Sequence, residues 1–239
     1  MDTFSTPIDT DAVRELVSHS GDPCVSIYLN LAETASAATD SQRLQNLIRM
    51  ATRLLQGRGR SSAEAAELLH DISRLAENSG FSSDAPGMGL FASPGYSASF
   101  ALGSAPMEQV SVNSLFHIRP LLERMDQVEV LGAAMRSRLA GIEQLRAAES
   151  EAVAEDLQQV LDAARNGEVE LLFISSDCRL SGNGKGLNDD TRMSYAGADL
   201  ANQAAIWTIE RGGEVLMTAP DELGNGTKLL AGLRSPRPV

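Results

Sequence analysis

GMGLFASPGYSASFALGSAPMEQVSVNSLFHIRPLL, residues 87–122, is the stretch that decides the fold of this chain. Its first part predicts a β-hairpin. Pro94 presets the first central position of a type II turn, and Gly95 tolerates the positive φ that the second position requires. Residues 89–92 and 97–102, rich in strand-forming and small residues, are then the two strands on either side of that turn.

Two further segments complete this stretch. Residues 109–112 alternate apolar and polar side chains, as a half-buried strand does. Residues 115–122 are mostly apolar but contain His117, Arg119 and a proline, and no local rule explains them. Because the sequence changes character after this segment, we expect an N-terminal α/β domain over 1–122.

Upstream of the hairpin, the chain predicts a short helix followed by a strand. Residues 12–17 have helical character, and Thr10 or Asp11 is the expected cap at their start. Residues 24–31 alternate with period two and are rich in strand formers. The odd positions of that strand are therefore expected in a core.

Two helices follow. Residues 40–56 carry an apolar stripe with the i, i+3, i+4 and i+7 spacing of an amphipathic helix. Ser61 and Glu64 form a capping-box pattern, which predicts a second helix that runs to about residue 77. The stripe of the first helix consists of Leu44, Leu47, Ile48, Ala51, Leu54 and Leu55, and the second helix is expected to bury Leu68, Leu69, Ile72 and Leu75.

After residue 122 the sequence becomes a long run of helix formers, with apolar residues at helical spacing and no proline up to Asn166. We expect a long helix or a helical hairpin, with a break near 147–150 and a second helix over 152–165. Such a segment is longer than a connection in a small domain requires. Its apolar stripe also supports an alternative hypothesis, that the chain forms a homo-oligomer through helices 123–165.

The last part of the chain predicts a second small α/β domain. Residues 169–175 are continuously apolar, as in a strand covered on both faces, and 214–218 and 228–233 are further strands. Residues 198–211 predict a helix that Gly212-Gly213 ends. With a right-handed crossover these elements form an α/β/α sandwich. The second domain with its helical connector thus covers 123–239.

Composition excludes several classes of protein. No run of about 18 apolar residues exists, so no membrane helix is expected, and the acidic amino terminus does not have the pattern of a signal peptide. Cys24 and Cys178 lie far apart and lack metal-ligand spacing, which is typical of a cytoplasmic protein with reduced thiols. A net charge of −12 argues against DNA binding and against general nucleic-acid binding, so any RNA contact must be local.

A local basic patch does exist. No acidic residue occurs between Asp40 and Glu64, although the chain is acidic overall. Arginines without acidic neighbours are the best candidates for contacts with phosphates, and the alternative is a solvated helix face whose arginines pair with acids elsewhere in the fold. The candidate RNA-binding residues are Arg43, Arg49, Arg53, Arg58 and Arg60.

The sequence offers no catalytic constellation. Residues 181–186 resemble a phosphate-binding loop, but Gly186 follows Lys185 where a P-loop requires serine or threonine. Asp189 and Asp190 with their neighbour provide too few ligands for a cation, and the three histidines lie on separate elements. We therefore expect no metal and no cofactor. A hydrolase that uses loop 176–196 is the third and weakest hypothesis.

Three segments resemble a known family. The strand PCVSIYLNL, the hairpin GMGLFASPGYSASFALG and the segment FHIRPLL resemble the first domain of the bacterial proteins related to archaeo-eukaryotic peptide-chain release factors and Pelota. Residues 167–175, 202–220 and 228–233 are similar to the last domain of those proteins, which has the α/β/α sandwich fold of kink-turn-binding ribosomal proteins. The resemblance covers about two thirds of this chain.

The chain differs from this family in the region that holds the middle domain and the catalytic tripeptide of release factors. Full-length relatives place a ribonuclease-H-like domain after the HIRPLL-like segment, and release factors carry a Gly-Gly-Gln tripeptide in it. Here about forty helical residues occupy that place, and Gly212-Gly213 precedes Glu214. The resemblance therefore implies a factor without peptidyl-tRNA hydrolysis, in which His117 and Arg119 are structural residues at the end of the first domain.

Together these observations predict an α/β protein of two small domains joined by a long helical segment. The leading functional hypothesis is a non-catalytic, cytoplasmic factor of translation that binds the ribosome or rRNA, in hibernation or at stalled ribosomes. Its first domain would contact rRNA phosphates through the five arginines.

Overall fold

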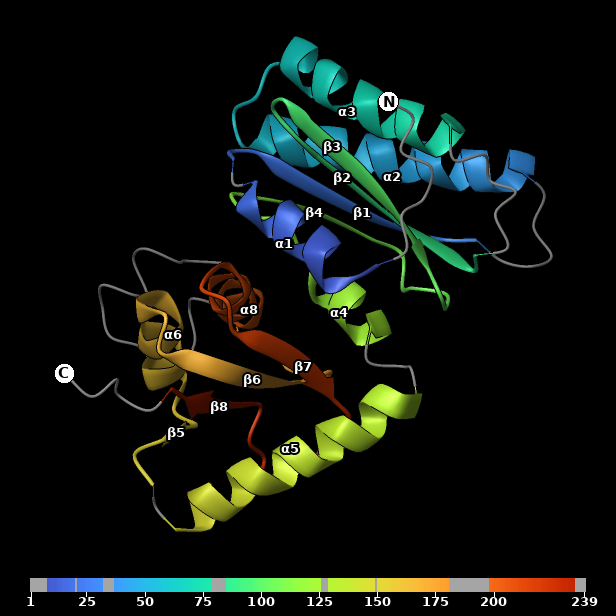
Figure 1. Cartoon of the computed structure of the whole chain (residues 1–239). Helices are drawn as coiled ribbons and strands as arrows, with labels where there is room; N and C mark the ends of the chain where they lie inside the picture. The colour runs from blue at the N-terminus through green and yellow to red at the C-terminus, as the bar shows by residue number, and fades with distance from the viewer. Residues whose placement is uncertain are drawn as a thin grey trace. The chain divides into compact units, whose positions relative to one another are not determined.

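The computed structural model of the chain describes residues 8–19, 21–31, 37–78, 85–125, 129–148, 150–180 and 198–234, with the side chains of residues 37 and 124–136 excepted. It is a mixed α/β structure with two four-stranded sheets, one in each of two compact units (Figure 1). The units are Met1–Arg124 and Met125–Val239, and each is described by itself.

The first unit contains an antiparallel sheet with the strand order β3-β2-β1-β4. The predicted hairpin, the strand before it and the strand after it are all confirmed, with β1 between β2 and β4. Gly95 in the hairpin turn has φ of 80°, as the second central position of a type II turn requires. The elements are α1 (Thr10–Ser18), β1 (Cys24–Asn30), α2 (Ala37–Gly57), α3 (Ser62–Asn78), β2 (Gly87–Ser93), β3 (Tyr96–Leu102), β4 (Gln109–Asn113) and α4 (Arg119–Met125).

Side-chain caps define the starts of two helices. The Ser61 hydroxyl accepts a hydrogen bond from the Glu64 amide, and the Glu64 carboxylate accepts one from the Ser61 amide, so the predicted capping box begins α3. The start of α1 differs from the prediction. Asp9, one residue earlier than Thr10, accepts the hydrogen bond from the Ala12 amide at 2.7 Å.

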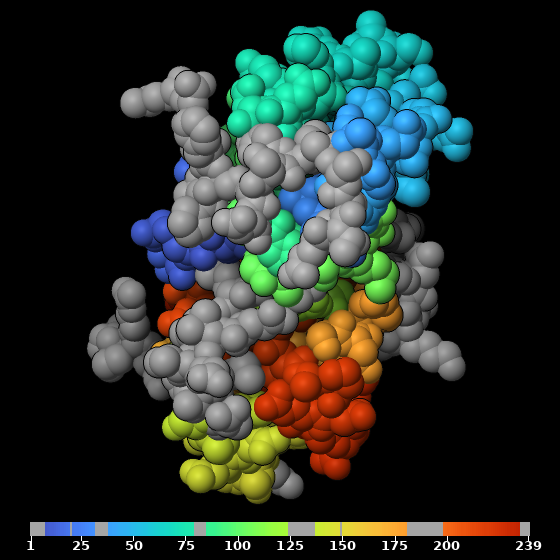
Figure 2. All heavy atoms as spheres, turned by 90° about the vertical axis from the view of Figure 1, so that its right-hand side faces the viewer, coloured from blue at the N-terminus to red at the C-terminus, as the bar shows by residue number. Residues whose placement is uncertain are grey.

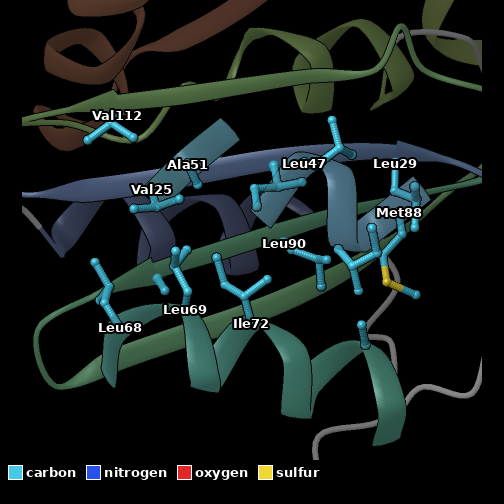
Figure 3. Packing of buried hydrophobic residues seen from close by; sticks show 14 of the residues in the cluster. Val25, Leu29, Leu47, Ala51, Leu68, Leu69, Ile72, Met88, Leu90 and Val112 are labelled. Atoms are coloured by element: carbon cyan, nitrogen blue, oxygen red, sulfur yellow. The ribbon is translucent and has the colours of Figure 1, made fainter. Parts of the chain in front are cut away.

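One face of the first sheet packs against α2 and α3 (Figure 3). The odd positions of β1, Val25, Ile27 and Leu29, are fully buried in this core, as predicted. The apolar stripe of α2 is also confirmed apart from Leu54, which is 42% exposed. Helical spacing placed Leu54 at the edge of the stripe, where the stripe turns away from the sheet.

The opposite face of the sheet explains the segment that no local rule predicted. The Tyr28 hydroxyl donates to the His117 carbonyl oxygen at 2.6 Å, and the Ser26 hydroxyl accepts from the His117 amide at 2.9 Å. Phe116 packs edge-on against Phe91, with ring centroids 5.6 Å apart. Residues 115–122 are therefore a cover for this face, and β1 is buried on both sides.

The second unit has the strand order β5-β8-β6-β7. Its strands β6 and β7 are parallel and are connected through α8, while β8 runs antiparallel to β6. The three predicted strands and the predicted helix over 198–211 are confirmed. The elements are α5 (Glu129–Ala147), β5 (Val153–Ala154), α6 (Leu157–Asn166), β6 (Val169–Ser175), α8 (Leu200–Glu210), β7 (Glu214–Thr218) and β8 (Leu229–Leu233).

The prediction of a helix over 152–165 is wrong at its start. Val153 and Ala154 form β5, which pairs with β8 at the edge of the sheet. The helix α6 begins only after Asp156, whose carboxylate accepts hydrogen bonds from the amides of Gln158 and Gln159. Sheet pairing of two apolar residues therefore outweighs their helical spacing.

Helix α5 is part of the second unit and packs against its sheet. Leu139 and Ile142 lie in one apolar cluster with Leu171, Phe173 and Leu230. Near the end of α5, Arg146 donates to the Leu223 carbonyl oxygen at 3.0 Å. Leu139 and Ile142 are thus buried within the chain's own second unit. These two residues therefore no longer support the hypothesis of a homo-oligomer through helices 123–165.

Among the helices of the described residues, none combines the length and the apolar character that crossing a bilayer requires.

Candidate nucleic-acid interface

Helix α2 and the turn after it carry all five arginines predicted to contact RNA. Three of the five, Arg43, Arg58 and Arg60, are bound to groups outside α2 in the first unit. The remaining two, Arg49 and Arg53, lie on the solvent-exposed side of α2. The structure therefore separates one predicted group into two classes with different surroundings.

Arg43 joins α2 to the segment before β4. It forms ion pairs with Asp40, at 3.2 Å, and with Glu108, at 2.6 Å. Asp40 is itself buried, with 3% exposure, so its carboxylate requires this partner. Arg43 is therefore paired with acidic residues of the fold, as the alternative interpretation of the sequence predicted.

Arg60 and Arg58 are also held. Arg60 donates to the Asp22 carbonyl oxygen at 2.6 Å and lies 3.4 Å from the Asp22 carboxylate. Arg58 is exposed and donates to the Asn113 side-chain oxygen at 2.7 Å. Because asparagine is neutral, the charge of Arg58 is not compensated by that contact, whereas that of Arg60 is.

Arg49 and Arg53 lie one helical turn apart, about 6 Å along the axis of α2. Arg49 donates to the Gln45 carbonyl oxygen at 3.3 Å and to the Asn46 side chain, neither of which carries a charge. Arg53 forms no hydrogen bond or ion pair with the described part of the chain. Both positive charges are thus available to a phosphate.

Two exposed apolar side chains accompany these arginines. Met50 is 46% exposed and Leu54 is 42% exposed. Together with Arg49 and Arg53, which are exposed, they form a surface that we call the α2 outer face. The blue atoms of α2 are visible in the space-filling view (Figure 2). The sequence analysis missed the apolar part, although i, i+4 spacing within a run of arginines was a usable signal.

The second unit contains a polar cluster of Ser175, Asp177 and Lys228. Lys228 donates to both carboxylate oxygens of Asp177, at 3.0 and 2.8 Å, and the Ser175 hydroxyl donates to the same carboxylate. The hydrogen bonds from Lys228 and then Ser175 lower the pKa of Asp177, and the bond to Asp177 raises the pKa of Lys228. A carboxylate with a lowered pKa is a weaker base than an ordinary one.

Other residues singled out in the sequence have structural surroundings or lie outside the described residues. His117 and Arg119 belong to the segment that covers β1, and Arg119 is buried with 3% exposure. Lys185, Asp189 and Asp190 lie outside the described residues. Within the described residues no group of three or more histidine, cysteine or acidic side chains is arranged to hold a metal ion.

The Gly212-Gly213 pair is a turn between α8 and β7. Gly212 has φ of 76°, which favours glycine. A Cβ atom on Gly213 would lie 2.7 Å from the Val169 carbonyl oxygen, so the backbone here passes too close to β6 for any side chain. Both glycines are accounted for by the fold of the second unit.

Comparisons with known proteins give distant structural similarity only. No family model matches the chain, and no curated protein sequence matches it. Among solved structures, the chain is similar to S. cerevisiae Dom34, described as a translation termination-like factor involved in RNA quality control pathways and interacting with Hbs1. That match has a TM-score of 0.32 and 12% identity, and it covers 50% of this chain. The chain spans 35% of the length of Dom34.

Two archaeal structures match over a larger part of the chain. The archaeal translation termination factor aRF1 matches with a TM-score of 0.33 and 8% identity, over 96% of this chain and 99% of the other. A structure described as an archaeal protein matches with a TM-score of 0.32 and 9% identity over the same shares. The chain thus has distant structural similarity, at low identity, to release-factor-like and Dom34-like proteins.

Proposed function

We propose that this chain is a non-catalytic factor of translation that binds the ribosome or rRNA through the α2 outer face. The observation that carries the proposal is the pair Arg49 and Arg53. Both are exposed, and neither is bound to a carboxylate of the described residues. In a chain with net charge −12, such a pair provides a local positive surface that attracts phosphates.

The apolar side chains of the α2 outer face support the same proposal. Met50 and Leu54 add exposed apolar surface at the positions that follow Arg49 and Arg53 on α2. A contact that combines phosphate binding with apolar packing suits a structured RNA or a ribosomal surface better than a bare charge contact does. Arg58 extends the basic surface toward β4.

The sequence resemblance to the release-factor and Pelota-related family sets the finer form of the proposal. The Gly-Gly-Gln tripeptide of release factors is absent from the sequence, so the proposed role is binding, in hibernation or at stalled ribosomes, and not peptide release. We further infer that the second unit is the family's α/β/α sandwich and docks protein or rRNA in the factor-binding region. The cytoplasm is the compartment that such a role requires.

The test is co-sedimentation of the full chain with ribosomes at low salt. The variant carries Arg49→Glu and Arg53→Glu. Its matched control carries Arg14→Glu and Arg165→Glu, which make the same change in net charge on two exposed arginines outside the α2 outer face. Circular dichroism of both variants checks that the fold is retained.

We expect the unchanged chain and the control to pellet with ribosomes, and the Arg49/Arg53 variant to remain in the supernatant. Equal loss of both variants would mean that net charge, and not this face, governs binding. If the unchanged chain stays in the supernatant, the proposed function is wrong.

A further inference from the structure

Strand β4 lies at one edge of the first sheet, and its outer side has no partner strand among the described residues. In an antiparallel pair, every second residue turns its N–H and C=O groups away from the neighbouring strand. Along β4 these outward groups form no hydrogen bond with the described part of the chain. Such a row of groups is a template on which a further strand can pair.

The sequence of β4 does not block such pairing. Folded proteins protect exposed sheet edges with charged side chains, proline or a β-bulge. The strand reads QVSVN, without charge or proline, and its register with β1 is regular from Gln109 to Asn113. The outer side of β4 is therefore open to a partner strand.

Helix α2 runs along this edge. In the first half of α2, Arg43 is paired with Glu108, the residue before β4, and just after the helix Arg58 donates to Asn113, the last residue of β4. The chain rises about 22 Å from Arg43 to Arg58, and a strand extends about 17 Å from Glu108 to Asn113. Helix and strand thus run side by side, in the same direction, over the whole length of β4.

Two exposed apolar side chains lie on the β4 side of α2. Met50 follows Arg43 by two helical turns, and Leu54 precedes Arg58 by one turn. Both therefore share the side of the helix that these arginines turn toward β4. The opposite edge strand, β3, lies beside α3, on which no described large apolar side chain is exposed. An open edge and an exposed apolar flank thus coincide at β4.

The charge beside this edge is positive. Arg58 is exposed, and its guanidinium group is bonded to the neutral side chain of Asn113. Arg49 and Arg53, on the adjoining strip of α2, are not bound to carboxylates of the described residues. Two copies of the chain paired through β4 would bring the arginines of both α2 helices together. Repulsion between these like charges disfavours a second copy and favours a partner with acidic side chains.

We propose that β4 binds an extended, acidic segment of a partner protein, which adds as a strand to its outer side. The segment carries apolar side chains at i and i+2, about 7 Å apart. These match Met50 and Leu54, which are about 6 Å apart along the axis of α2. An acidic side chain beyond them pairs with Arg58. Backbone pairing supplies affinity, and the apolar and charged contacts select the sequence, as in other cases of strand addition.

The added strand uses Met50 and Leu54 but not Arg49 and Arg53, and it requires neither RNA nor the ribosome. Its binding is therefore measured without either, so that its failure and a failure of the proposed function are separate results. The probe is a labelled synthetic peptide in which valine alternates with threonine after two glutamates. The measurement is fluorescence anisotropy with the full chain.

Two matched pairs of variants test the side-chain contacts. Leu54→Ser should weaken binding about fivefold, whereas Leu145→Ser on α5 should leave it unchanged. The exposed fractions of these two leucines are 42% and 44%. Arg58→Gln should weaken binding about threefold, and Arg165→Gln, which removes another exposed charge, should have no effect. Circular dichroism checks that each variant keeps its fold.

Two modified peptides test the backbone pairing. One carries N-methyl groups on its odd positions and the other on its even positions, so only one of them loses the N–H groups that face β4. That peptide should lose binding, and the other should keep it. Hydrogen exchange should slow over residues 109–113 when the unmodified peptide binds, and should not change over β3.

Several outcomes would overturn the proposal. Failure of the glutamate peptide to bind, or equal binding of a peptide with lysines in place of the glutamates, would remove its chemical basis. Equal binding of both N-methylated peptides, or unchanged binding in Leu54→Ser, would place the contact outside β4. If the chain alone forms a dimer that Leu54→Ser dissociates, a second copy occupies the edge. If Leu54→Ser weakens binding of an RNA oligonucleotide while no peptide binds, this flank belongs to an RNA surface.

Discussion

At the scale of single residues, Tyr28 joins the sheet of the first unit to the segment that covers it. Its hydroxyl donates to the His117 carbonyl oxygen, and its ring packs edge-on against Phe91. Tyr28→Phe keeps the ring contact but removes the hydrogen bond in a fully buried place. We expect a loss of about 1 to 3 kcal/mol in the free energy of unfolding, measured by urea denaturation.

Tyr96 provides the matched control for this change. It lies on β3 in the same aromatic cluster, but its hydroxyl forms no hydrogen bond with the described residues. Tyr96→Phe should therefore change the free energy of unfolding much less. Equal effects of the two variants would show that the Tyr28 hydroxyl does not hold the 115–122 segment.

Alkaline pH tests the burial of β1 through its cysteine. Burial raises the pKa of Cys24 to about 11, against an ordinary value of 9.0. Between these two values the unfolded chain loses the thiol proton while the folded chain keeps it, so stability falls as the pH rises through this interval. Urea midpoints should change little between pH 8 and 9 and fall between pH 9 and 11, and Cys24→Ala should reduce that fall. A midpoint that does not change over this interval would contradict the burial.

At the scale of elements, the capping box sets the start of α3. The Ser61 hydroxyl accepts from the Glu64 amide and donates to the Glu64 carboxylate. We expect Ser61→Ala to lower the free energy of unfolding by about 1 kcal/mol. Ser73→Ala is the control on the same helix, because Ser73 lies in its interior, where alanine is the better helix former. Thermal denaturation measures both variants.

The same cap predicts a pH effect at the acidic end. Hydrogen bonds from the Ser61 hydroxyl and then the Ser61 amide lower the pKa of Glu64 below its ordinary value of 4.5. The carboxylate therefore stabilises the folded state above that value, and this contribution is lost as the pH falls through the lowered pKa. Helix content measured by circular dichroism should fall less steeply below pH 4.5 in Glu64→Gln. Identical acid curves for the two chains would contradict the cap.

Local patterns predicted most elements because each element depends on its own residues. The Pro94-Gly95 turn, the capping box and the strand β1 were predicted from short-range features, and all three are confirmed. The period-two alternation of β1 does not appear in its burial, because both faces of the strand are covered. The cover segment 115–122 was not predictable, since its polar backbone groups are bonded to Ser26 and Tyr28, about ninety residues away in the sequence. Pairing of β5 with β8 is a contact of the same long-range kind.

The candidate site was predictable only as a set of residue types. Sequence spacing identified the arginines of α2, but the partners that distinguish Arg43 and Arg60 from Arg53 come from other elements. Glu108 precedes β4 and Asp22 precedes β1, so both pairings require the folded sheet. The alignment of α2 with the outer side of β4 is equally a product of tertiary packing.

At the scale of the whole molecule, charge sets how the proposed RNA contact should respond to salt. The chain carries a net charge of −12, which repels RNA, and the α2 outer face offers two arginines that no described carboxylate binds. Each phosphate that an arginine neutralises contributes a slope of about −0.7 to −0.9 to the dependence of log K on log salt. Two contacts therefore predict a slope of about −1.4 to −1.8.

Co-sedimentation with ribosomes over a series of salt concentrations measures this slope. In Arg53→Gln the slope should become shallower by the contribution of one phosphate contact, about 0.7 to 0.9. Arg14→Gln, which removes the same charge from α1, should leave the slope unchanged. A slope several times steeper would require a larger basic surface than the α2 outer face, which would place the main RNA contact elsewhere on the chain. A slope near zero would mean that apolar contacts, such as those of Met50 and Leu54, carry the binding without the arginines.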